Sequence, residues 1–218
     1  MQPITVSVGP LAAASANNIA LSQTVSGAAN GVINGSLASG GVATLDQPRR
    51  VLITNAGNDS GITFTVYGTW FNGQIISETV QGTNGSTVAT TLDFATVTRI
   101  ATSGSTSASG ITVGTNTVAG SRWVRLDSWA NPAVNLQTEV SGTVNYTIQT
   151  TNEDPNDPFN PVALTGVTWF SSTDTAVVGA TAAKQSSFTN APTYVRILQN
   201  SGTGTTTAIL IQYSSVPY

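Results

Sequence analysis

Histidine and cysteine are absent from this 218-residue chain, and lysine occurs once, at Lys184. The absence of cysteine excludes a disulfide framework and a thiolate metal site. The absence of histidine removes the side chain that most often serves as a general acid or base near neutral pH. Charged residues make up 8% of the sequence, against roughly 25% in an ordinary soluble domain. We therefore expect a structural or binding protein and not an enzyme.

Two catalytic arrangements stay open after this exclusion. Lys184 and Ser186 are two residues apart, so they would share one face of a strand. No supporting acid or oxyanion element is recognisable beside them, and a solvated lysine on a strand is the simpler interpretation. Carboxylate pairs such as Asp46 with Glu78 cannot be placed from the sequence, which leaves glycoside hydrolysis open.

The distribution of charge also bears on the expected partners. The seven basic residues are scattered along the chain, whereas a nucleic-acid binder needs a basic footprint that neutralises phosphates. Residues 1–18 have neither a positive segment nor a continuous apolar segment, so they make a poor secretory signal. No run approaches the ~18 apolar residues of a membrane span. We expect neither nucleic acid nor a membrane as a partner.

Period-2 patterns dominate the sequence and predict strands. Ile62, Phe64 and Val66 alternate with Thr63, Thr65 and Tyr67, as in a half-buried strand. Asn72-Gly73 is a tight-turn signal between that strand and residues 75–80. Residues 134–150 are typical of a β-hairpin that turns at Ser141-Gly142.

Helix signals are poor, because the Ala-rich residues 10–21 have no clear apolar face. We expect an all-β fold with two β-sandwich-like or jelly-roll-like domains, since turn signals recur every 8–12 residues or so. The expected organisation is an N-terminal extended arm or edge strand at 1–20, a β-sandwich domain at 21–118 and a second domain at 121–218.

One loop offers oxygen ligands for a cation. Glu153, Asp154 and Asp157 fall within five positions, together with Asn156. Carboxylate and amide oxygens at this density suit Ca²⁺. The run lacks the spacing and closing Glu of an EF-hand, and a Pro-stiffened acidic surface loop is the simpler interpretation. We expect no cofactor, with Ca²⁺ at these three carboxylates as the alternative.

Aromatic residues raise the further alternative of sugar binding. The four Trp residues are Trp70, Trp123, Trp129 and Trp169. Tryptophan rings provide stacking platforms for sugars, although in β domains they more often belong to the core. Trp70 precedes the Asn72-Gly73 turn and is the one for which we expect exposure.

Several short motifs, taken together, resemble the virion structural proteins of tailed bacteriophages. They include GITFTV at 61–66, ISETV at 76–80 and an F-x-x-V-T-x-I strand at 94–100. Further similar stretches are residues 6–10, 48–60, 72–75, 140–146 and 191–197. The likeness covers most of the chain and extends to head decoration (cement) proteins, head fibres and tail components, which are mostly β sandwiches or jelly rolls.

The resemblance implies a capsid decoration protein on the outer surface of the virion, made in the host cytoplasm. Its expected partners are the major capsid protein and copies of itself, as a trimer or dimer. The expected contact residues are Ile4, Val6 and Val8 of the arm, through strand addition to a neighbour, together with Arg49, Arg50 and Trp70. On this interpretation, loss of residues 1–10 would weaken shell binding and leave the fold intact. The alternative is a tail, head-fibre or host-binding module with a carbohydrate-binding face.

Overall fold

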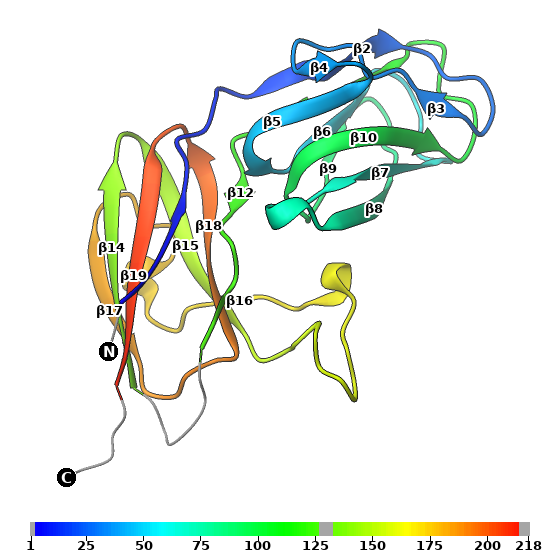
Figure 1. The fold of residues 1–218 in the computed structure, drawn as a ribbon. Coiled ribbons are helices and arrows are strands. Elements are labelled where there is room, and N and C mark those ends of the chain that lie inside the picture. The colour runs from blue at the N-terminus through cyan, green and yellow to red at the C-terminus, as the bar shows by residue number, and fades with distance from the viewer. Residues whose placement is uncertain (1–2, 127–132, 214–218) are drawn as a thin grey trace. The chain divides into compact units, whose positions relative to one another are not determined.

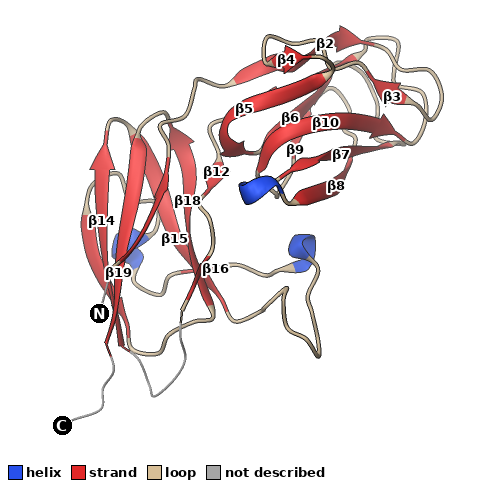
Figure 2. Cartoon of the chain, in the orientation of Figure 1, coloured by secondary structure: helices blue, strands red, loops and turns tan. Residues whose placement is uncertain are grey.

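A computed structural model describes residues 3–126 and 133–213 of the chain. Within this part the fold is all-β, as the sequence predicts, and every strand pairing is antiparallel. The helical elements of the same residues are three short 3-10 helices, namely η1 (Phe71–Gly73), η2 (Leu164–Gly166) and η3 (Thr175–Val177). Figures 1 and 2 show strands connected by loops throughout.

The chain forms two compact units. The middle unit comprises residues 12–117, and the terminal unit combines residues 1–11 with residues 118–218. The sequence places a boundary between 118 and 121, and the structure changes unit between residues 117 and 118. The first eleven residues belong with the C-terminal half of the chain, which the sequence does not indicate.

The middle unit contains two sheets. The larger has the strand order β4-β5-β10-β7-β8, with β3 also paired to β10, and the smaller has the order β2-β11-β6-β9. The strands of the larger sheet are β3 (Asn30–Gly31), β4 (Ala38–Ser39), β5 (Val42–Arg49), β7 (Thr63–Thr69), β8 (Ile75–Gln81) and β10 (Phe94–Thr102). Those of the smaller sheet are β2 (Ser15–Gln23), β6 (Val51–Asn55), β9 (Thr87–Ala89) and β11 (Ile111–Thr115).

Sequence alternation explains the β7–β8 hairpin at one end of the larger sheet. Phe64 and Val66 of β7 are fully buried, while Thr63 and Thr65, which alternate with them, are half-buried. Asn72 and Gly73 have φ values of 60° and 77°, the left-handed conformation that an Asn-Gly turn uses. The hairpin partners then pair from Thr63 with Gln81 to Thr69 with Ile75.

The described residues of the terminal unit also form two sheets, with the orders β1-β19-β14-β17 and β12-β18-β15-β16, and β13 pairs with β18. The first consists of β1 (Ile4–Val8), β14 (Ala133–Ser141), β17 (Lys184–Phe188) and β19 (Thr205–Tyr213). The second consists of β12 (Ala119–Gly120), β13 (Val124–Arg125), β15 (Val144–Thr151), β16 (Phe170–Ser171) and β18 (Tyr194–Gly202). Figure 1 shows the dark-blue N-terminal strand beside the red β19.

A single apolar core joins the two sheets of the terminal unit. Alternate residues of β14 and β19, such as Leu136 and Leu210, pack with Ile148 and Ile197 of the second sheet. The hydroxyls of the buried Tyr146 and of Thr138 lie 2.6 Å apart, and Tyr146 also donates to the carbonyl of Ala182 at 3.0 Å. The only polar group of this large side chain is thereby hydrogen-bonded, as burial requires.

Candidate functional site

The three predicted contact residues of the arm lie in β1, at one end of its sheet. β1 pairs with β19 from Ile4 opposite Leu210 to Val8 opposite Thr206. Val6 and Val8 are buried in the core of the terminal unit, whereas Ile4 is exposed. The backbone of residues 4–8 therefore has a strand partner within its own chain, and only Ile4 of the three offers a side chain to a partner.

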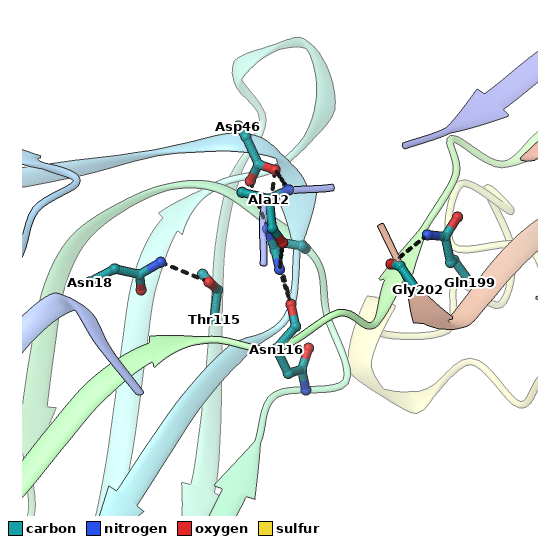
Figure 3. A network of polar contacts seen from close by, with 8 residues as sticks. Ala12, Asn18, Asp46, Thr115, Asn116, Gln199 and Gly202 are labelled. Carbon is teal, nitrogen blue, oxygen red and sulfur yellow. Dashed lines mark hydrogen bonds and ion pairs between the residues drawn. The ribbon is translucent and has the colours of Figure 1, made fainter. Parts of the chain in front are cut away.

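Arg49 has an internal role in the middle unit. Its side chain is fully buried, and its Nη1 atom lies 3.0 Å from Oδ1 of Asp46. Its Nε atom donates to the carbonyl of Asn116 at 2.9 Å, and its Nη2 atom donates to the carbonyls of Asn116 and Ala12. Figure 3 shows Ala12, Asp46 and Asn116 gathered around this network.

The two backbone partners of Arg49 lie at the two ends of the middle unit. Ala12 is the first residue of the middle unit, and Asn116 is the second to last. One guanidinium thus fastens the segment by which the chain enters this unit and the segment by which it leaves. We call Arg49, Asp46, Ala12 and Asn116 the Arg49 clamp.

Asp46 binds Ala12 as well as Arg49. Its Oδ2 atom accepts a hydrogen bond from the backbone N–H of Ala12 at 2.6 Å. Partial burial acts to raise the pKa of Asp46, but the N–H of Ala12 and the guanidinium of Arg49 outweigh it and lower the pKa from its ordinary value. The carboxylate is therefore held in its charged form.

Arg50 and Trp70, the other two predicted contact residues, are half-buried in the middle unit. Arg50 lies between β5 and β6, where the chain passes from the larger sheet to the smaller. Trp70 precedes η1, and its ring contacts that of Phe71 edge-on at 5.2 Å. The arm residues belong to the terminal unit and Arg49, Arg50 and Trp70 to the middle unit, so the six residues are not drawn from a single unit.

Other scarce charged groups are also engaged inside the units. Glu78 is buried on β8, and its carboxylate accepts from the N–H groups of Thr91 and Leu92 and from the hydroxyl of Thr91, at 2.7–3.0 Å. Buried Asp59 accepts from the N–H of Ser107 at 2.6 Å. These carboxylates order the loops that follow β9 and β10.

The three candidate calcium ligands accept hydrogen bonds from protein groups. Glu153 accepts from the N–H of Thr168 at 2.5 Å, and Asp157 accepts from the N–H groups of Phe159 and Asn160. Asp154 accepts from Asn156 and from the hydroxyl of Tyr194, and it faces Arg125 at 3.3 Å. Among the described residues no three acidic side chains are grouped to hold a metal ion. Ca²⁺ at this loop stays a prediction.

Two of the four tryptophans meet in an aromatic cluster over the second sheet of the terminal unit. The rings of Trp123 and Trp169 are 4.9 Å apart and edge-on, and Trp123 contacts Tyr194 at 5.8 Å. The guanidinium of Arg196 lies 4.1 Å from the Trp169 ring centre, and its Nε atom donates to Gln149. Burial raises the pKa of Tyr194, so its hydroxyl stays protonated. Trp129 lies outside the described residues.

One exposed aromatic residue was not singled out from the sequence. Phe159 is 95% exposed, the largest exposed fraction among the large apolar side chains of the described residues. The signal that identifies it is a phenylalanine closely flanked by Pro158 and Pro161 inside an acidic loop. Such a ring is neither in a core nor covered by its own loop.

Comparison with protein-family models, curated proteins and solved structures finds no match for the chain. Within the described residues, no helix is long and apolar enough to cross a membrane.

Proposed function

We propose that the chain is a structural protein of a tailed-bacteriophage particle that binds the outer surface of the assembled head and stabilises contacts between major capsid subunits. The supporting observation is where its few charges lie. Arg49, Arg196, Asp59, Glu78 and Asp93 are buried. Five of the 17 charged residues are thus buried inside the chain, although charge at the surface normally keeps soluble β proteins apart.

The outward face of the edge strand β8 is neutral. β8, at the end of its sheet, exposes Ile75, Ser77, Thr79 and Gln81, while its one charged residue points inward. Charged side chains on an edge strand are a usual barrier to pairing with another sheet. A surface of this kind suits a chain that functions within an assembly, in line with the short motifs that resemble those of phage virion proteins.

The proposed mechanism is thermodynamic. A protein that binds only the assembled shell stabilises the shell by mass action against the pressure of the packaged genome. Repetition over the lattice adds avidity wherever neighbouring copies touch each other. Strand addition by residues 4–8 is not needed for this mechanism, because β1 already occupies a place in its own sheet.

Heat stability of the particle tests this proposal. Phage heads that lack the chain should release their DNA at a lower temperature than wild-type heads, and purified chain added back should restore the wild-type value. Release at the same temperature with and without the chain would overturn the decoration role.

A second candidate function is a host-binding module of the tail or a head fibre, and the aromatic cluster favours it. Half-buried Trp123 and Trp169 lie beside the donors and acceptors of Arg196 and Gln149, a combination found in sugar-binding sites. A glycan array probed with the purified chain tests it. Binding that Trp123→Ala abolishes would favour this function, and absence of binding to any glycan would exclude it.

A further inference from the structure

The connection between β15 and β16, residues 152–169, is long for a loop and contains only the short helix η2. Ordering such a segment costs about 1–2 kcal/mol of backbone entropy per residue. Loops of this length in compact domains are usually either functional or disordered. Because this loop is ordered by specific contacts, we take it as a candidate functional segment and describe those contacts first.

The base of the loop is fastened at both ends. Glu153, near its start, accepts a hydrogen bond from the N–H of Thr168, near its end. Asp154 is held by the hydroxyl of Tyr194 at 3.0 Å and by Arg125 at 3.3 Å. Trp169 at the end of the loop packs against Arg196 of β18. The aromatic cluster thus anchors the loop on its sheet.

The tip of the loop is held by a different carboxylate. Oδ1 of Asp157 accepts from the N–H of Phe159 at 2.8 Å and from the N–H of Asn160 at 3.0 Å. The same two bonds lower the pKa of Asp157 and keep it charged. Pro158, directly before Phe159, and Pro161, two residues after it, each have a backbone φ angle fixed by their own ring. The backbone that carries Phe159 is therefore restrained in one conformation.

The ring displayed by this restrained backbone is almost fully exposed. Phe159 is 95% exposed, although covering a phenylalanine side chain is worth about 1.5–3 kcal/mol. Aromatic anchors that enter a partner's pocket commonly dominate protein interfaces, and prior ordering reduces the entropy lost on binding. An exposed ring on an ordered loop has the form of such an anchor.

The charge of the loop defines the chemistry of its partner. Glu153, Asp154 and Asp157 are its charged residues, and Arg125 is the cation that the structure places against them. The loop therefore presents Phe159 within a net negative surface. A complementary surface has an apolar pocket rimmed by arginine or lysine.

We propose that residues 152–169 are the docking loop of this protein, and that Phe159 inserts into an apolar, basic-rimmed pocket on the outer surface of the capsid shell protein. This inference rests on the proposed decoration function and names the surface that performs it. It assigns to Phe159 the anchoring role that the sequence assigned to the arm.

Co-sedimentation with heads purified from phage particles that lack the chain tests the docking loop. Phe159→Ala should weaken binding about 30-fold or more, the loss typical of a central anchor. Asp157→Asn should weaken binding less, and the loss should shrink as salt is added. Phe170→Ala is the matched control, because Phe170 is 64% exposed on neighbouring β16 but lies outside the loop. It should bind as the wild type does.

The outcomes separate the two proposals. Equal binding by wild type, Phe159→Ala and Phe170→Ala would overturn the docking loop and leave the decoration function standing. Failure of the wild-type chain to bind heads would overturn the decoration function. It would also overturn the proposal that the shell protein is the partner of the docking loop. If Phe159→Ala instead changed the oligomeric state in sedimentation velocity and left head binding intact, the partner of the loop would be a second copy, and the shell pocket would be rejected.

Discussion

The buried guanidinium of Arg49 donates to the carbonyl of Asn116, with its Nε atom 2.9 Å from the oxygen. The same group donates to the carbonyl of Ala12 at 3.0 Å and pairs with Asp46. A charge buried in this way is stable only because each of its donors has a partner. The clamp therefore links the integrity of the middle unit to the two points at which the chain crosses its boundary.

Loss of the Arg49 side chain should be strongly destabilising. Arg49→Ala removes the cation paired with the carboxylate of Asp46 and the side-chain donor of two backbone carbonyls. We expect the free energy of unfolding to fall by about 3–5 kcal/mol, measured by guanidinium denaturation. The control is Arg122→Ala, because Arg122 is exposed and surface changes usually stay within about 0.5 kcal/mol. Equal effects of the two substitutions would contradict the clamp.

Acid should weaken the clamp through Asp46. The pKa of Asp46 in the folded chain lies below its ordinary value of 3.8, so the unfolded chain binds the proton more readily. The stability contributed by Asp46 is then complete above about pH 4 and is lost as the pH falls through the folded-state pKa. Asp46→Asn should flatten the fall of the denaturation midpoint below pH 4. Parallel curves for the two proteins in that range would show that Asp46 does not contribute.

Glu78 should hold the loop that follows β9. Glu78→Gln replaces charge-assisted hydrogen bonds with neutral ones and puts an amide donor beside the N–H groups of Thr91 and Leu92. We expect a loss of about 1.5–3 kcal/mol and faster hydrogen exchange at Thr91 and Leu92. Glu139→Gln, at an exposed position of β14, should change neither quantity. Unaltered exchange in Glu78→Gln would mean that the carboxylate does not order this loop.

Removal of β1 should unfold or loosen the terminal unit, contrary to the expectation from the sequence that residues 1–10 are dispensable for the fold. Deleting them removes the buried Val6 and Val8 and a complete strand pairing with β19. We expect a loss of about 3–6 kcal/mol from the two valines alone. Deletion of residues 1–3, which stops short of β1, is the control. Identical thermal unfolding of the two truncated proteins would show that residues 4–8 do not stabilise the terminal unit, as expected of a free arm.

The sequence predicted the elements whose signals are local. Alternation at 62–67 and the turn at Asn72-Gly73 correspond to β7 and β8, and residues 134–150 correspond to β14 and β15. β2 was missed because residues 15–23 do not alternate, and its pairing with β11 is interrupted by two register shifts. The all-β class is confirmed, while the sandwich or jelly-roll assignment stays a prediction.

The candidate sites depended on contacts that sequence spacing does not encode. Arg49 and Asn116 are 67 positions apart. The residues next to Arg49 in the sequence therefore do not reveal that its side chain is buried, and the sequence predicts a surface contact residue instead. The exposure of Phe159 likewise depends on the absence of covering residues from elsewhere in the chain. Flanking prolines indicate a restrained loop, but only the structure shows that the ring of Phe159 is exposed to solvent.

Electron cryo-microscopy of intact phage particles tests the proposed decoration function most directly, by locating the density of the chain and counting its copies. Decoration predicts hundreds of copies repeated over the outer face of the head, with residues 152–169 at the contact with the shell. A few copies confined to the tail or to one vertex, or no copies on the particle, would contradict the decoration function.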